Sequence, residues 1–387
     1  MQYDSWWYPK GLRSGTETWW PMKKIFPGGF KYVYNKTDLP FGCHNRYWDS
    51  DVTYAKFNGG KFQFIKDPLS GLTLPDDDTF WLFLFQQTQE WGNFFLYEQD
   101  WLNIQTEATF ALQSDLDLGR RWLEQMGRNA EKFGISIQYC MAYSRHILQS
   151  LEIPAVTQAR ASEDYQPGKR QWDIGITSMF IHAVGLAPSK DTFWTTAVQP
   201  GNRYHAVENN TVLNHLVATL STGPVGPGDM IGALNKSLIM RCCDSEGRIL
   251  QPSKPATAID DQIIKGTFPS YPGPQGQVWT SYSKISNNVF GIVLATEMEN
   301  QYSLTPEAGW SGQLAPSVVY GQEPWASHRP VEFSSQHPLV LGADCSAERP
   351  CVFYTSPTIL VLPNLTGTTV KANTITRRFF IQTIGSA

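Results

Sequence analysis

Strand-like and helix-like segments alternate along the chain up to about residue 268. This alternation restricts the possible folds more than any other feature of the sequence. Helical spacing of three and four predicts a helix over residues 115–133, with Gly134 as its C-cap, and a strand follows at 135–141. Further short strands are predicted at residues 192–195 and 223–230, and a hairpin within 57–74. Strands that alternate with helices form parallel β/α units. Beyond residue 269 only short β-rich runs follow, at residues 277–285, 288–295, 351–355 and 358–362. We therefore predict a parallel β/α domain over 1–268 and a small antiparallel β-sandwich domain over 269–387.

The stretch from Trp91 to Leu102 holds the most informative strand. Phe94 to Tyr97 form an apolar run that predicts a strand buried on both faces, and it ends at Glu98 and Asp100. In a (β/α) barrel the catalytic groups lie at the C-terminal ends of the strands. An acidic loop that caps the next helix is the alternative interpretation of this stretch.

A second acidic strand end follows the predicted strand 155–160, where Arg160 precedes Asp164. A retaining glycosidase needs two carboxyl groups roughly 5–5.5 Å apart, one as nucleophile and one as acid/base. Two strands of one barrel can place carboxyls across a cleft of that width. The alternative is a structural ion pair between Asp164 and Arg160.

Composition excludes several classes of function. The net charge is −4 without a basic run, so nucleic acid is not an expected partner. No stretch approaches the roughly 18 apolar residues that span a bilayer, so no membrane partner is expected. No metal-ligand spacing and no phosphate-binding loop is present, so we predict no metal and no cofactor. The 14 tryptophans suit sugar stacking, but they also suit a core.

The cysteines and the N-terminus bear on localisation. Cys345 and Cys351 flank a short polar loop and can either form a disulfide or remain free thiols; the spacing decides neither. The N-terminus lacks the features of a signal peptide. Sequons favour an extracellular or lysosomal location only weakly; they begin at Asn35, Asn209, Asn235 and Asn364.

Several strand ends, in order from residue 1 to about 260, resemble those of the α-galactosidase and raffinose synthase group of glycoside hydrolases (family 36). Arg160-Ala161-Ser162-Glu163-Asp164-Tyr165 resembles the Arg-Ala-Ser-Asp-Asp-Phe of raffinose synthases, and Gly223 to Asp229 resembles the eighth barrel strand. The stretches 4–7, 39–44, 97–100 and 139–141 resemble the ends of the second to fifth strands.

The resemblance implies a (β/α)8 TIM-type barrel that begins at strand 2, without the first strand and the N-terminal β-sandwich. We therefore expect an incomplete gene product or a barrel closed in another way. The resemblance also implies that Asp100 is the nucleophile and that Asp164 is the acid/base. The further positions it marks for contact with an oligosaccharide or glycoside substrate are Asp4, Ser5, Trp6, His44, Glu98, Cys140, Arg160 and Asp229. For His44 a purely structural role is the alternative, and Asp229 can instead shape its Gly-rich turn.

Two positions depart from the family pattern. Ser5 replaces an aspartate, and Glu98 replaces a lysine two residues before the nucleophile, which reverses a charge. Both departures weaken the expectation of α-galactose as the substrate. The predicted function is a retaining α-glycoside hydrolase, or a transglycosidase if a sugar replaces water as acceptor. The alternative is a non-catalytic sugar-binding homologue or an inactive fragment.

Overall fold

The computed structural model describes residues 1–311, 314, 317–321 and 331–357. The chain divides into two compact units. The first comprises Met1–Arg160 with Val184–Leu186, and the second comprises Ala161–Ala183 with the described residues from Ala187 onward. The domain boundary at residue 268 stays a prediction.

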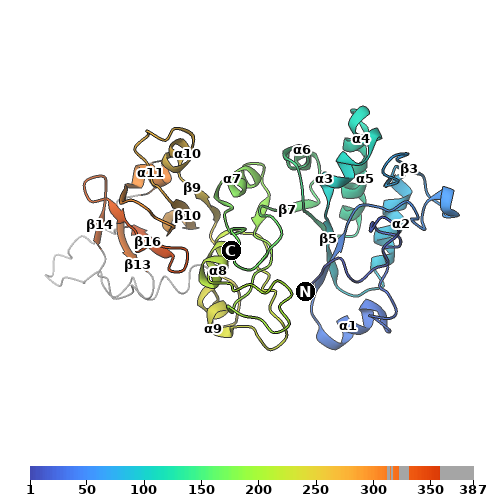
Figure 1. The fold of residues 1–387 in the computed structure, drawn as a ribbon, viewed down its shortest axis with the longest axis horizontal. Coiled ribbons are helices and arrows are strands. Elements are labelled where there is room, and N and C mark those ends of the chain that lie inside the picture. The colour runs from blue at the N-terminus through green and yellow to red at the C-terminus, as the bar shows by residue number, and fades with distance from the viewer. Residues whose placement is uncertain (312–313, 315–316, 322–330, 358–387) are drawn as a thin grey trace. The chain divides into compact units, whose positions relative to one another are not determined.

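The first unit is built on a parallel sheet (Figure 1). Its strands, in spatial order, are β1 (Gln2–Tyr3), β2 (Phe41–Asn45), β5 (Phe94–Gln99), β6 (Ser136–Tyr139) and β7 (Val156–Arg160). Each neighbouring pair is parallel, which confirms the predicted β/α arrangement. The part of the chain that the structure describes contains no closed barrel.

The helices of this unit follow the predicted spacing. α5 (Leu118–Lys132) buries Trp122, Met126 and Ala130, and Gly134 follows it with a φ of 66°, as a C-terminal glycine should. The other helices are α1 (Gly29–Thr37), α2 (Asp78–Thr88), α3 (Leu102–Glu107), α4 (Phe110–Ser114), α6 (Ser144–Gln149) and the 3-10 turns Lys56–Asn58 and Ser150–Glu152. The predicted hairpin within 57–74 is the antiparallel pair β3 (Phe64–Lys66) and β4 (Thr73–Pro75).

The two faces of the parallel sheet differ in chemistry. On one face Tyr97 packs against Trp81 and Phe85 of α2, and Tyr3 stacks on Phe30 of α1. The other face carries polar side chains, because residues that alternate along a strand point to opposite sides. The sequence predicted that β5 is buried on both faces. Phe95 is 42% exposed, so the prediction is wrong at that position.

The second unit contains an antiparallel sheet. Its strands, in spatial order, are β14 (Val331–Phe333), β13 (Ser317–Gly321), β16 (Cys351–Pro357), β11 (Asn288–Thr296), β10 (Gln277–Ile285) and β9 (Lys254–Ala258). One face packs against Trp310 and the other against Trp172, so both faces are apolar. A separate pair, β12 (Tyr302–Leu304) with β15 (Leu339–Leu341), lies antiparallel.

The remaining elements of this unit are α7 (Gly175–Ala183), β8 (Ala187–Ser189), α8 (Thr211–Leu220), α9 (Lys236–Ile239), the 3-10 turn Met240–Cys242, α10 (Asp260–Thr267) and α11 (Pro306–Trp310).

Two predicted strands of the second unit are wrong. Residues 192–195 and 223–230 form no strand, and only an isolated bridge joins Phe193 to Pro227. In 223–230, Pro224 and Pro227 lack the amide hydrogen that a ladder needs. Residues 192–195 contain no proline, and there the amide of Thr195 donates to the side chain of Asp229 instead of to a neighbouring strand. The strands β8 and β9 were not predicted. The predicted strand 358–362 lies outside the described residues.

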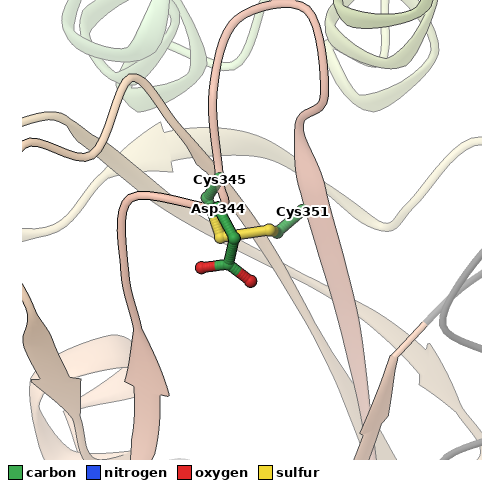
Figure 2. Close-up of side chains that lie close together, drawn as sticks. All are labelled: Asp344, Cys345 and Cys351. Atoms are coloured by element: carbon green, nitrogen blue, oxygen red, sulfur yellow. A yellow bond between two sulfur atoms is a disulfide. The ribbon is translucent and has the colours of Figure 1, made fainter.

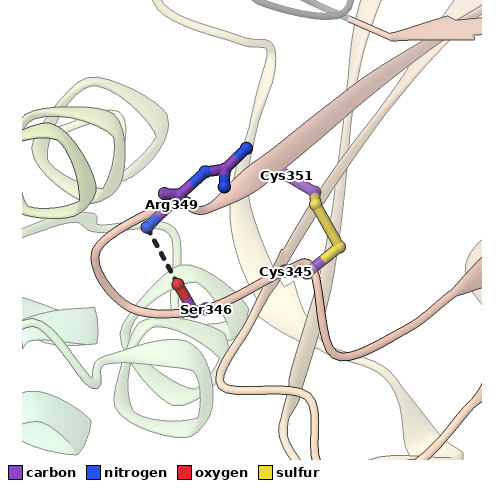
Figure 3. The surroundings of a disulfide bond; sticks show 4 residues. All are labelled: Cys345, Ser346, Arg349 and Cys351. Atoms are coloured by element: carbon purple, nitrogen blue, oxygen red, sulfur yellow. Dashed lines mark hydrogen bonds between the residues drawn. A yellow bond between two sulfur atoms is a disulfide. The ribbon is translucent and has the colours of Figure 1, made fainter.

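The structure decides between the two alternatives for the cysteine pair. Cys345 and Cys351 form a disulfide with Cα atoms 5.1 Å apart, and between them the backbone amide of Arg349 donates to Ser346 Oγ at 3.1 Å (Figure 3). The bond ties the loop before β16 to the strand itself. In the part of the chain that the structure describes, no helix is both long and apolar enough to cross a bilayer.

Candidate functional site

Two tiers of polar side chains lie at the C-terminal ends of the strands in the first unit. The lower tier is set by register: His44 pairs with Glu98, Glu98 with Gln138, and Gln138 with Gln158. Paired residues on parallel strands point to the same face. Two residues further along their strands come the members of the upper tier, which are Asp100, Cys140 and Arg160. Four strands, β2, β5, β6 and β7, thus bring ionisable groups to one edge of the sheet.

His44 links the two tiers. His44 Nε2 lies 3.0 Å from Asp100 Oδ2, and His44 Nδ1 lies 2.9 Å from the hydroxyl of Tyr8. Asp4 Oδ1 is 3.9 Å from the same Nε2. Tyr8, His44 and Asp100 are 1%, 2% and 8% exposed, so their hydrogen bonds are shielded from water. The imidazole therefore holds the Asp100 carboxylate in one orientation.

Asp100 is kept ionised by its neighbours. Burial alone would raise its pKa, but the hydrogen bond and charge of His44 and the charge of Arg160 outweigh burial, so the pKa of Asp100 is lowered. Burial in turn lowers the pKa of His44, but the bond to Asp100 and the charges of Glu98, Asp100 and Asp4 raise it overall. An ionised carboxylate can only accept, so His44 Nε2 donates to Asp100.

The pKa of Glu98 is shifted in the opposite direction from that of Asp100. Glu98 is 7% exposed, and its Oε2 accepts a hydrogen bond from Gln2 Nε2 at 2.5 Å. Burial, together with the nearby charges of Asp100 and Asp4, raises the pKa of Glu98 to about 7, although His44 and Gln2 pull it down. Two carboxyls two residues apart therefore have pKa values shifted in opposite directions. Such divergence is typical of functional sites.

The backbone turns sharply after both central strand ends. Trp101 follows Asp100 with a φ of 58°, and Met141 follows Cys140 with a φ of 47°. Left-handed backbone is unfavourable for residues other than glycine and clusters at functional sites. The turn at Trp101 lets its amide donate to Asp100 Oδ1 at 2.6 Å. Asp100 thus has both oxygens fixed, one by Trp101 and the other by His44.

Cys140 and Arg160 complete the surroundings of Asp100. Cys140 is fully buried, and its hydrogen bond to Asp100 contributes to the lowered pKa of that carboxyl. Burial raises the pKa of the Cys140 thiol well above its ordinary value, so it stays protonated and donates. Arg160 Nη2 contacts Met141 Sδ at 3.1 Å.

Ser5 and Trp6 lie in the turn after β1. Ser5 Oγ accepts from Lys10 Nζ at 3.3 Å. Trp6 is 49% exposed and stacks on Phe26 with ring centroids 5.7 Å apart. One side of an indole is thereby supported while a large part of it faces solvent, an arrangement that suits stacking on a sugar ring.

Asp164 and Asp229 belong to the second unit. Asp164 is exposed and lies in the loop where Tyr165 N donates to Asp191 Oδ2 at 2.6 Å. Asp229 Oδ1 accepts from Thr195 and from Gln199 Nε2, at 2.7–2.9 Å. Asp229 therefore does shape its turn. Its contact with substrate, and the pairing of Asp164 with Asp100, stay predictions.

Sequence reasoning missed three residues of the site: Tyr8, Gln2 and Gln138. The first two bind His44 and Glu98, and Gln138 neighbours Glu98 in the lower tier. A signal for two of them was present. The glutamines precede polar strand ends by two residues, as in Gln2-x-Asp4 and Gln138-x-Cys140, and period two places such pairs on one face. Tyr8 had no comparable signal.

One group of potential metal ligands lies in the second unit. Asp344, Cys345 and Cys351 place their ligand atoms within 4.8 Å of one another (Figure 2). Both sulfur atoms belong to the disulfide, however. A metal binds thiolates, so this group does not fit a metal ion. No other such group occurs among the residues that the structure describes.

The comparisons with known proteins give no family. No family model and no curated protein sequence matches the chain. Among solved structures, the isomaltulose synthase SmuA from Protaminobacter rubrum has 9% identity and a TM-score of 0.42, covering 90% of this chain and 89% of its own. The isomaltulose synthase from Erwinia rhapontici NX5 has 11% identity and a TM-score of 0.41, with coverages of 91% and 90%.

A third solved structure is AbfB, a family 51 α-L-arabinofuranosidase from Bifidobacterium longum. It has 9% identity and a TM-score of 0.30, covering 91% of this chain and 80% of its own. The three similar proteins are carbohydrate enzymes by name, but at these identities and TM-scores the similarity carries no argument about the chemistry of this chain. Its function has to be argued from the site itself.

Proposed function

We propose that the chain is a retaining α-glycoside hydrolase of the α-galactosidase and raffinose synthase type, with Asp100 as nucleophile and Asp164 as acid/base. The observation that carries the proposal is the state of Asp100. It is a buried carboxylate at the end of a parallel strand, kept ionised and fixed at both oxygens by His44 and Trp101. A carboxylate nucleophile has to be ionised and oriented before the sugar arrives.

The reaction proceeds by double displacement. A carboxylate oxygen of Asp100 attacks the anomeric carbon and the glycosidic bond breaks, while Asp164 gives its proton to the departing oxygen. The product is a glycosyl ester of Asp100. Asp164, now ionised, removes a proton from water, and the water oxygen displaces Asp100 from the anomeric carbon. If a sugar hydroxyl takes the place of water, the same steps give transfer instead of hydrolysis.

The other predicted positions serve the substrate. Asp4, which lies beside His44, is assigned to sugar hydroxyls, and the exposed indole of Trp6 is assigned to the ring face. The charge of Arg160 supports the Asp100 carboxylate, and Cys140 donates to it. His44 is a positioning residue in this scheme, since it acts on the nucleophile. Asp229 Oδ2 has no hydrogen-bond partner among the described residues, so it remains the oxygen that could meet a sugar.

The decisive test is turnover of aryl α-galactosides and α-glucosides by the purified chain and by Asp100→Asn. Loss of an attacking carboxylate should lower kcat by about 10³-fold or more. Asp38→Asn is the matched control, because Asp38 is exposed and lies between α1 and the N-terminal end of β2, away from the C-terminal strand ends that carry the site. Equal, low turnover by the wild-type chain and by Asp100→Asn would contradict the proposal that the chain is a glycoside hydrolase.

A second candidate function is carbohydrate binding without catalysis. The exposed, supported indole of Trp6 favours it, because a stacking platform needs no nucleophile. Ser5 in place of an acid favours it as well. Saturable sugar binding without turnover, weakened by Trp6→Ala, is the result that would select this candidate over the hydrolase.

A further inference from the structure

The strand-end site of the first unit is rich in acidic side chains. Three carboxyls, those of Asp4, Glu98 and Asp100, converge there with the imidazole of His44 and the guanidinium of Arg160. The Nε2 of His44 is committed to Asp100. Glu98 is buried, and its Oε2 accepts from the neutral side-chain amide of Gln2, so that hydrogen bond brings no compensating charge. A ligand that fits this site should bring donors and positive charge.

The neighbouring glutamine supports the same conclusion independently of the acids. Gln138 is 5% exposed and pairs in register with Glu98, so both side chains point to the same face. Its Oε1 has no hydrogen-bond donor among the described residues, and the same holds for Oε1 of Gln158 on the next strand. A buried acceptor without a donor is costly, and a donor-rich ligand would relieve that cost.

We propose that the site selects a sugar that carries a free, protonated amino group, and that Glu98 binds this ammonium. The inference rests on the proposed function, since it names the substrate class of the same site. An ammonium supplies three donors and one positive charge, whereas a hydroxyl supplies a single donor and no charge. Glu98 and Gln138 offer acceptors side by side, and Asp4, whose side chain is 77% exposed, gives the site a negative entrance.

Binding measured by calorimetry on the full chain tests the proposal without requiring turnover. The probes are 2-amino and 6-amino derivatives of galactose and glucose, each against its parent sugar and its N-acetylated form. A charge-assisted hydrogen bond to a buried carboxylate should make at least one amine bind about tenfold or more tightly than its parent sugar. Acetylation should abolish this preference, because it removes the charge but keeps the nitrogen.

Glu98→Gln should remove the preference for the amine, because glutamine keeps the shape of the side chain without its charge. Glu90→Gln is the matched control, since Glu90 is exposed in the turn after α2. The comparison of amine, parent sugar and N-acetyl sugar on the unaltered protein remains decisive if Glu98→Gln does not fold.

The outcomes separate this inference from the proposed function. Equal affinity for every amine and its parent sugar would overturn the inference, even if aryl glycosides are turned over. A preference for an amine that survives in Glu98→Gln would also overturn it, because another group would then bind the ammonium. Amine-selective binding that depends on Glu98, without turnover, would support the inference and reject the hydrolase.

Discussion

The two units bury charge in different ways. In the first, the buried acids Glu98 and Asp100 lie near each other and near His44, and their pKa values move apart. In the second, buried Glu208 is satisfied by loop partners: its Oε2 accepts from the Tyr165 hydroxyl at 2.8 Å and its Oε1 from Asn210 N at 2.8 Å. Buried charge that is fully paired stabilises loops, whereas charges that compete for partners are typical of a site.

The sheets explain this difference. Parallel strands bring all their C-terminal ends to one edge, so groups from distant parts of the sequence meet there. The antiparallel sheet of the second unit alternates strand directions and packs apolar side chains on both faces, with Val278 and Val293 on one and Trp279 and Leu294 on the other. Such a sheet supplies a core and leaves its acids on the surface and in loops.

The strongest test of the contrast between the two units concerns Asp164, a residue of the second unit. If it is the acid/base, Asp164→Asn should reduce kcat by about 10²- to 10⁴-fold on substrates with poor leaving groups. Aryl glycosides with acidic leaving groups should lose much less in their first step, since they need no protonation. Steady-state kinetics over a series of aryl leaving groups measures this.

Glu163→Gln is the control for Asp164, because it alters the adjacent acid in the same loop. If Asp164→Asn behaves like Glu163→Gln on every substrate, the chemistry is confined to the first unit and the acid/base assignment is wrong.

A smaller effect is expected in the way the free energy of unfolding depends on pH. The folded pKa of Glu98 is raised to about 7 from an ordinary 4.5, so the unfolded state releases this proton more easily. This group therefore lowers the free energy of unfolding as pH rises from about 4.5 to 7, by about 2–3 kcal/mol. Glu98→Gln should flatten this part of the profile, measured by urea unfolding at a series of pH values.

Asp100 affects the free energy of unfolding in the opposite direction and in a lower pH range. Its folded pKa is lowered from 3.8, so its contribution to stability is present above that value and is lost as pH falls through the folded pKa. The clearest window for Glu98 is pH 4.5 to about 6, because the raised pKa of His44, to which the charge of Glu98 contributes, lies above 6.5. A Glu98→Gln profile parallel to that of wild type would contradict the assignment.

The smallest effect tests the second unit. The disulfide closes a loop with a sequence separation of six, so removing it should lower the free energy of unfolding by about 2 kcal/mol. Cys345→Ser with Cys351→Ser, compared with the free thiol variant Cys243→Ser, shows this in chemical unfolding. Glycoside turnover should be unchanged at temperatures where both proteins are folded. A loss of turnover in the folded double variant would show that the catalytic site depends on this loop.

Much of the first unit could be predicted from local pattern. The helical spacing ending at Gly134 and the apolar run before Glu98 located α5 and β5, because periodicity and end signals are local properties. The predicted strands at residues 192–195 and 223–230 were wrong. Prolines in the second stretch lack the donors for a ladder, and in the first the amide of Thr195 bonds to the side chain of Asp229, a tertiary contact that local pattern does not show.

Local pattern is enough to identify the residues that end the parallel strands, and therefore to name Asp4, Glu98, Asp100 and Arg160 as candidates for one site. How these residues interact depends on the folded chain. The register between β2 and β5 sets His44 beside Glu98, and His44 Nε2 lies 3.0 Å from Asp100 Oδ2. The turn of the backbone at Trp101 brings its amide to the other oxygen of the same carboxylate. Burial and these contacts, which no linear pattern encodes, then push the pKa values of two neighbouring acids in opposite directions.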